Sequence, residues 1–286
     1  MDQVNLSAWQ GRHEMQTGVI SAAQAAQIHA TLGAAGTSAP AEGEIMPPLW
    51  HWFAFAPAVA NNRLARDGHP KLGDFLPPVP LERRMWASGA LTFHAPLKVG
   101  ESFEKHSVIS RVEEKEGRTG RMVFVTVEHR IDAGGVTAIQ ERQDIVYLDI
   151  PDRFRPPEKL PMPDAPVLHR QACATEPLLF RFSAITFNAH RIHYDLPYAR
   201  DIEHYPGLVV HGPLQACWLI DAARAHRGVA PLAFRFRGVH PMLLIPGETG
   251  EIDIMATDPG EGALSLYSGQ AGHQCMQATA SWEENT

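Results

Sequence analysis

Four histidines gather in one short stretch of the chain, residues 182–212, which reads FSAITFNAHRIHYDLPYARDIEHYPGLVVHG. It holds His190, His193, His204 and His211 together with Asn188. An unperturbed imidazole titrates near pH ~6.5, so these side chains suit general acid–base catalysis near neutral pH. Polar residues this dense, beside an apolar helix, indicate a site on a loop that a rigid scaffold holds in place.

A metal centre is the alternative interpretation of the same histidines. His190 and His193 lie three residues apart, and Asp195 is close by. However, the segment lacks the HExxH helix pattern, and its prolines interrupt any continuous helix. Its glycines match neither a phosphate-binding loop nor a dinucleotide fingerprint. We therefore expect neither a metal ion nor a bound cofactor in this segment.

Two sets of strand-like segments must position this site. Between residues 90 and 150, four segments alternate in polarity or are rich in β-branched residues, so we expect four antiparallel strands. In the second half we expect a strand at 178–185, a helix at about 211–226, and then the strands FRFRGVHPMLLI, GEIDIMATDPG, GALSLYSGQ and HQCMQATASWEE. The parallel between the halves indicates an internal duplication.

The other segments set the expected boundaries. Residues 7–33 have helical character, with Ser21 as the cap of a helix that ends at glycine. The aromatic run PPLWHWFAFAP begins a buried helix or lines a pocket, and residues 66–84 form a long ordered loop. Six prolines between 151 and 166 predict a linker, because proline cannot donate to a strand ladder. We therefore expect an N-terminal unit with a helical extension (1–150), a linker (151–166) and a C-terminal unit that carries the polar segment (167–286).

Composition argues against several other classes of protein. The formal net charge is −7 and no long basic run occurs, so a nucleic-acid-binding surface is not expected. The three cysteines form no CxxC pair, which favours a reducing compartment over a disulfide framework. The N-terminus lacks the apolar core of a secretory signal, and no apolar stretch is long enough to span a bilayer. We expect a cytoplasmic protein without membrane attachment.

The polar segment resembles a known family motif. Residues 188–193, NAHRIH, resemble the MaoC-like (R)-specific enoyl-CoA hydratase motif of Asp, any residue, Asn, Pro, an aliphatic residue and His. SAITFNAHRIHYD with YPGLVVHGP is more similar to the hydroxyacyl-thioester dehydratase type 2 branch, which includes mesaconyl-CoA and itaconyl-CoA hydratases. RRMWASGALTFHAPLKVGE resembles the first hot-dog unit of that branch, so the resemblance covers most of residues 45–286. It implies an α+β double hot-dog fold, in which two antiparallel sheets each wrap a long helix, and it allows a homodimer.

The chain departs from the wider motif at two positions. The Asp of the family is Asn188 here, and its Asn is His190. An amide cannot act as a general base, so we expect His193 to carry the proton. Asn188 would then hold the attacking water, and the N–H of Gly212, at a helix start, would bind the thioester oxyanion.

The remaining candidates are substrate-binding residues. We expect His190 and His211 to contact the substrate. Trp86 with Arg83 and Arg84 is a candidate to wall the pocket, and a place in the core is the alternative for Trp86. Arg191 and Arg181 are candidates to grip a second carboxylate, because a guanidinium binds a carboxylate through two parallel hydrogen bonds.

These features together predict a hydratase for a small enoyl-CoA thioester, with itaconyl-CoA or mesaconyl-CoA as the preferred substrate. Two alternatives remain at the level of sequence. One is a 3-hydroxyacyl-ACP dehydratase, which would need a basic surface for its acidic carrier protein. The other is a hot-dog module that binds acyl thioesters without catalysis, which the replacement of the family's Asp by Asn188 keeps open.

Overall fold

The computed structural model describes residues 5–34, 36–117, 120–260 and 262–283. The first half of the chain forms β1 (His13–Val19), β2 (Arg83–Phe93), β3 (Ser102–Gly117), β4 (Gly120–Ala133) and β5 (Val136–Leu148). The second half forms β6 (Leu168–Cys173), β8 (Ala233–Gly238), β10 (Glu251–Thr257), β11 (Ala263–Gln270) and β12 (His273–Ser281). Alternating polarity accounts for such strands, and in β10 every second residue is buried.

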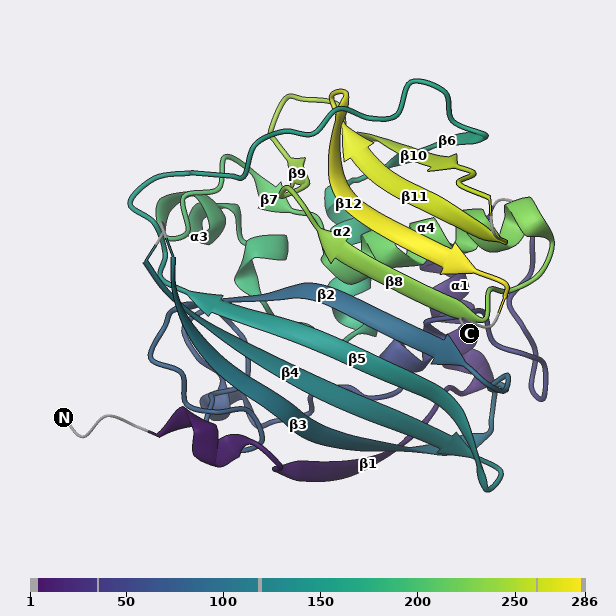
Figure 1. Cartoon of the computed structure of the whole chain (residues 1–286), viewed down its shortest axis with the longest axis horizontal. Helices are drawn as coiled ribbons and strands as arrows, with labels where there is room; N and C mark the ends of the chain where they lie inside the picture. Colours follow the sequence, from purple (N-terminus) through teal and green to yellow (C-terminus); the bar gives the residue numbers. More distant parts are fainter. Residues whose placement is uncertain (1–4, 35, 118–119, 261, 284–286) are drawn as a thin grey trace.

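These strands make one antiparallel sheet, in the order β1-β3-β4-β5-β2-β8-β12-β11-β10-β6 (Figure 1). The strands of each half lie together. The two groups meet where β2 pairs with β8, from Ser88 opposite Arg237 to Thr92 opposite Ala233. The two expected strand sets are thus joined edge to edge, and neither half leaves this edge open to solvent.

The long helix of the second half is α4 (Gly212–Arg227), which confirms the helix expected at 211–226. It packs against β10, β11 and β12 and buries Leu214, Leu219 and Ala223. Gly228 ends the helix in the left-handed conformation (φ 77°), which glycine adopts without steric cost.

Short helices and aromatic side chains pack against the strands of the first half. Its helix α1 (Ala22–Leu32) begins at the predicted cap, where Ser21 and Gln24 form a reciprocal capping box, and it packs against α2 (Glu176–Ile185). The aromatic run forms the short helix η2 (Trp50–Phe53), because the prolines around it prevent a longer one. The Trp52 ring lies 4.9 Å from the Trp86 ring and 6.0 Å from the Phe236 ring. Aromatic side chains therefore cover these strands where a second long helix was expected.

Residues 178–185 belong to helix α2, so the strand expected there is wrong. The Thr175 side chain caps α2 by accepting a hydrogen bond from the Leu178 N–H, and Pro177 occupies the first turn. A short apolar run such as LLFRFSAI fits the helical and the strand period equally well. The cap and the proline at its start are the signals that decide between them.

An edge strand also interrupts the helical region expected at 7–33. β1 pairs with β3 from His13 opposite Val108 to Val19 opposite Ser102. Its exposed and half-buried positions alternate along HEMQTGV. This alternation has the two-residue period of a strand, so the continuous helical region expected at 7–33 is wrong for these residues.

The proline-rich segment that connects β5 to β6 lies along the start of β12. The Met162 N–H donates to the Gly272 carbonyl (3.0 Å), and the Gln274 N–H donates to the Leu160 carbonyl (2.8 Å). Its backbone is thus held by hydrogen bonds although it forms no strand or helix of its own.

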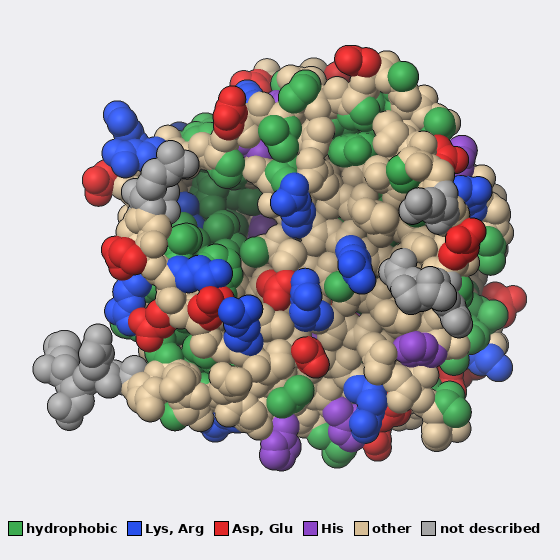
Figure 2. All heavy atoms as spheres, viewed as in Figure 1, with side chains coloured by type: hydrophobic (Ala, Val, Ile, Leu, Met, Phe, Trp, Pro, Cys, Tyr) green, Lys and Arg blue, Asp and Glu red, His purple; other side chains and the backbone are tan. Residues whose placement is uncertain are grey.

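The face of the molecule in Figure 2 carries acidic and basic side chains interspersed with one another. It offers no continuous basic field of the kind that nucleic-acid binding requires. Within the described ranges, each helix falls short of the length or the apolarity needed to cross a membrane.

A single large hydrophobic cluster contains residues from both halves, among them Phe103 and Ile131 of the first half and Leu219 and Phe234 of the second. Because the halves share one core, groups that lie on either side of their junction keep a fixed relative position.

Candidate active site

The polar segment between α2 and α4 folds into a compact series of turns. It contains η4 (Arg191–His193), α3 (Leu196–Asp201) and β7 (Leu208–Val209), and β7 pairs with β9 (Leu243–Leu244). Asn188 Oδ1 accepts a hydrogen bond from the His190 N–H (3.0 Å), and the Asn188 N–H donates to the Ser183 carbonyl (2.8 Å). The side-chain oxygen of Asn188 thus stabilises the turn, and its amide N–H groups remain for a ligand.

Four imidazole rings form a row through this region. Their centroids are 4.1 Å apart between His69 and His190, 5.3 Å between His190 and His193, and 3.6 Å between His193 and His211. Burial and the neighbouring imidazoles lower the pKa of His193 well below its usual value and that of His211 to about 3. His193 and His211 are therefore uncharged at neutral pH.

Hydrogen bonds fix the tautomer of His193. Its Nδ1 lies 2.7 Å from the Val209 carbonyl and must donate to it, so Nε2 is free to accept a proton. The ring stacks on His211, whose Nε2 lies 2.8 Å from the Ser183 hydroxyl. Gly212 follows at the first position of α4, where backbone N–H groups have no partner within the helix. The structure thus brings the expected base and the expected oxyanion donor into one region.

Asp67 and His69 add a carboxylate–imidazole pair that the sequence analysis did not include. Asp67 Oδ2 accepts from His69 Nδ1 at 2.7 Å, and Oδ1 accepts from the His69 backbone N–H at 3.0 Å. Burial raises the pKa of Asp67, but the hydrogen bonds and charge of His69 outweigh it and hold that pKa well below its usual value. Burial, Arg84 and His190 lower the pKa of His69 to about 3. An ionised carboxylate therefore orients a neutral imidazole whose Nε2 accepts hydrogen bonds.

The loop that carries this pair is fixed to the motif. The Arg191 N–H donates to the Asp67 carbonyl (2.9 Å). Gly68 has a φ of +91°, and a Cβ there would lie 1.8 Å from the Ala189 carbonyl oxygen. Only glycine fits this position, so the contact with the Asn188 turn determines where Asp67 and His69 lie.

A cavity of about 1080 Å³ lies between these two segments. Ser183 and Asn188 of the second half and His69 and Arg84 of the first half line it. A cavity of this size holds a small-molecule ligand, and its polar groups converge from two sides. Both halves of the chain therefore build the site.

The basic side chains at the cavity differ from the two arginines, Arg191 and Arg181, that were expected to bind a carboxylate. Arg84 lines it and forms no salt bridge within the part of the chain that the structure describes, and Lys71 lines it as well. Its neighbour Arg83 is buried and paired with Glu203 at 3.1 Å. A half-buried guanidinium without an acidic partner is suited to bind an anionic group of a ligand.

The three other expected binding residues lie elsewhere. Arg191 donates to Asp195 Oδ2 through Nη2 at 2.7 Å, so its guanidinium is already neutralised. Arg181 is exposed on α2 and donates to the backbone of α1. Trp86 packs in the aromatic cluster between β2 and η2. All three are missing from the described lining of the cavity, as are His190, His193, His211 and Gly212, which belong to the adjoining row of imidazoles and the start of α4.

Asp67, His69 and His190 each offer a ligand atom within 4.8 Å of the other two, which is also the spacing of a metal site. These atoms already have partners, since His69 Nδ1 binds Asp67 and His190 Nε2 lies 3.5 Å from the Glu203 carboxylate. One nitrogen of each imidazole thus already faces a carboxylate, and His69 Nε2 remains free to accept a hydrogen bond. The arrangement fits acid–base chemistry better than metal binding.

Comparisons with known proteins agree with this geometry. Residues 49–244 match the family model described as hydroxyacyl-thioester dehydratase type 2. The chain is 42% identical over 275 residues to a protein of Chloroflexus aurantiacus named mesaconyl-C(4)-CoA hydratase, which covers 93% of this chain and 97% of that protein. It is 29% identical to the mitochondrial hydroxyacyl-thioester dehydratase type 2 of Schizosaccharomyces pombe, over 63% of this chain and 67% of that protein.

Solved structures share the fold. A MaoC-like dehydratase of Phytophthora capsici superposes with a TM-score of 0.74 at 10% identity, covering 99% of both chains. A Mycobacterium tuberculosis protein described as having a double hot-dog fold superposes with a TM-score of 0.58 at 13% identity, covering 95% of both chains. Together with the shared sheet and the long helix α4, these matches confirm the expected fold class. The chain is a hydro-lyase with the double hot-dog fold, and it belongs to the hydroxyacyl-thioester dehydratase type 2 family.

Proposed function

We propose that this enzyme adds water to the double bond of a small enoyl-CoA thioester, and that its preferred acyl groups are short, branched dicarboxylic acids such as mesaconyl and itaconyl. The observation that carries the proposal is the cavity that Asn188 and His69 line from opposite halves of the chain, with His69 held by its hydrogen bond to Asp67. The similarity to the protein named mesaconyl-C(4)-CoA hydratase supports the choice of acyl group.

Hydration requires a base for the proton of the attacking water, a proton for Cα, and donors for the thioester oxygen as enolate charge builds. In the proposed mechanism His193 Nε2 takes the proton from water as the new C–O bond forms at Cβ. It returns that proton to Cα, so one imidazole balances the addition. The amide N–H groups of Asn188 hold the water oxygen.

Gly212 is the proposed oxyanion donor, through its backbone N–H at the start of α4. A Cβ at this glycine would meet only the Met276 side chain, at 3.8 Å, which is an ordinary contact. The packing of the protein itself thus does not require glycine here. A thioester that approaches the backbone closely does require it, which supports the assignment.

We assign His69, oriented by Asp67, the place of a second acceptor for the water. The family motif has a carboxylate where this chain has Asn188, and an amide N–H cannot accept a hydrogen bond. His69 Nε2 accepts one, because Nδ1 donates to Asp67. With one O–H directed at His193 and the other at His69, a lone pair of the water oxygen is left to attack Cβ.

Steady-state hydration of crotonyl-, mesaconyl-, itaconyl- and octenoyl-CoA tests the function, with crotonyl-ACP as a further substrate. We expect the highest kcat/KM on the two dicarboxylic thioesters. Higher kcat/KM on octenoyl-CoA would refute the proposed acyl group. Preference for the ACP thioester would indicate a carrier-dependent dehydratase, and thioester binding without turnover would indicate a binding module.

A further inference from the structure

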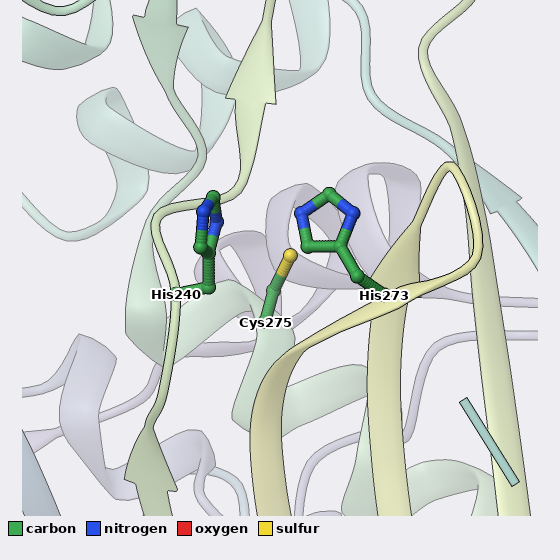
Figure 3. Close-up of side chains that lie close together, drawn as sticks. All are labelled: His240, His273 and Cys275. Atoms are coloured by element: carbon green, nitrogen blue, oxygen red, sulfur yellow. The ribbon is translucent and has the colours of Figure 1, made fainter. Parts of the chain in front are cut away.

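A second group of ligating side chains lies away from the cavity. His240 follows β8 in the turn toward β9, and His273 and Cys275 belong to the first residues of β12. Their exposed fractions are 8%, 7% and 1%. Figure 3 shows the Cys275 sulfur between the two imidazole rings, and one ligand atom of each residue lies within 4.8 Å of the other two.

The ring nitrogens in this group lack partners. His240 Nε2 and both ring nitrogens of His273 are buried without a hydrogen bond to any residue that the structure describes. Such atoms are costly, because buried polar groups are normally paired. This group therefore differs from Asp67, His69 and His190, in which one ring nitrogen of each histidine faces a carboxylate.

The backbone holds the three ligands in place. The N–H groups of Val239 and His240 both donate to the Cys275 carbonyl, at 2.8 and 3.2 Å, which fixes the turn to β12. His240 Nδ1 lies 2.9 Å from the Pro241 carbonyl and donates to it. This hydrogen bond leaves the Nε2 lone pair of His240 free, as in most metal-binding histidines.

We propose that His240, His273 and Cys275 bind one Zn²⁺ ion, with water at the fourth position. Two imidazoles and a thiolate are ligands that zinc prefers. Tetrahedral zinc sets its ligand atoms about 3.3–3.8 Å apart, given bond lengths of about 2.0–2.3 Å, so closing the site shortens their separations by at most about 1.5 Å. Burial raises the pKa of the Cys275 thiol to about 12, although a hydrogen bond to the Gln270 backbone and the charge of Lys159 oppose this shift, so the ion must displace a proton.

The ion would hold a turn that supports the active site. The turn at His240 leads into β9, which pairs with β7, and the Val210 N–H donates to the Met242 carbonyl (2.9 Å). The Val209 carbonyl in turn fixes the His193 ring. We therefore assign the ion a structural role, and the hydration chemistry needs no contribution from it.

Zinc content per chain tests the proposal, measured on protein stripped with chelator and then dialysed against Zn²⁺. Co²⁺ serves as a spectroscopic probe, because a cobalt–thiolate bond produces a charge-transfer band. We expect one ion per chain and the cobalt–thiolate band in the wild type. Cys275→Ser should lose the band, and His240→Gln and His273→Ala should each weaken Zn²⁺ binding at least about tenfold. Bound Zn²⁺ should also raise the Tm of the wild type but not that of Cys275→Ser.

Two control variants make the test specific. Cys217→Ser removes another buried cysteine, and His69→Ala removes a ligand from the group at the cavity; both should keep one zinc ion and the cobalt band. Absence of stoichiometric binding at micromolar free Zn²⁺, or unchanged binding in Cys275→Ser, would overturn the proposal. Neither result bears on the hydratase function, which is measured separately by turnover.

Discussion

Asp67→Asn is the most informative perturbation of the active site. The substitution keeps the size of the side chain but replaces an acceptor that lies 2.7 Å from His69 Nδ1. An asparagine can donate its amide N–H to Nδ1, which would move the imidazole proton to Nε2. His69 would then present a donor where the proposed water needs an acceptor.

The lost interaction is a hydrogen bond that involves a charged group, worth about 1.5–3 kcal/mol, which corresponds to a roughly 10- to 150-fold decrease in kcat. Steady-state hydration of mesaconyl-CoA measures this decrease in kcat. Asp201→Asn is the matched control, because Asp201 is an exposed carboxylate at the end of α3 that does not line the cavity. KM should change little, since the water and not the thioester loses its partner.

A double-mutant cycle separates this role from a general loss of structure. His69→Ala should reduce kcat by a similar factor, and the double variant should lose little more than either single variant, because the two residues act as one unit. Additive losses, or a kcat of Asp67→Asn equal to that of the control, would refute the assignment of the pair.

The other predictions concern residues in and around the candidate active site. His193→Ala should lower kcat by ~10²–10⁴-fold while binding of a saturated acyl-CoA, measured by calorimetry, survives; near wild-type kcat would require another base. Asn188→Asp should lower kcat/KM and raise the pH optimum of the remaining activity, because a carboxylate repels the enolate and raises the pKa of His193; higher kcat/KM on every thioester would show the opposite. Arg84→Gln should raise KM for mesaconyl-CoA at least about tenfold and leave crotonyl-CoA unaffected, and equal effects on both would argue against a carboxylate contact. The folded-state pKa values of His69 and His211 are about 3, below the usual imidazole value of 6.5, so the unfolded chain binds more protons between these values. The Tm should therefore fall as pH decreases below ~6.5 and stay level above it; a Tm that is flat across this window in scanning calorimetry would contradict these shifts.

Local signals in the sequence predicted the elements whose caps and periodicity agree. The helix α4 follows from an apolar run between Gly212 and Gly228, and α1 follows from Ser21. Where two local signals conflict, the prediction was wrong: residues 178–185 carry an apolar run that fits a strand, while Thr175 and Pro177 start a helix. Part of the site was also predictable, because Asn188 and His193 are close together in the sequence and lie in one turn-rich segment.

The other wall of the site depends on contacts between residues that are distant in the chain. Asp67 and His69 stand in a loop of the first half, and only the packing of Gly68 against the Ala189 carbonyl places them beside the motif. Neighbouring residues also determine which arginines are free to bind a ligand. Asp195 neutralises Arg191, whereas Arg84 lines the cavity without an acidic partner in the described chain. The sequence by itself determined which residue types are available and which helices and strands carry them. The tertiary structure decided which of them meet and which charges remain unpaired, because strand register and loop packing are set by the shared core rather than by any local pattern.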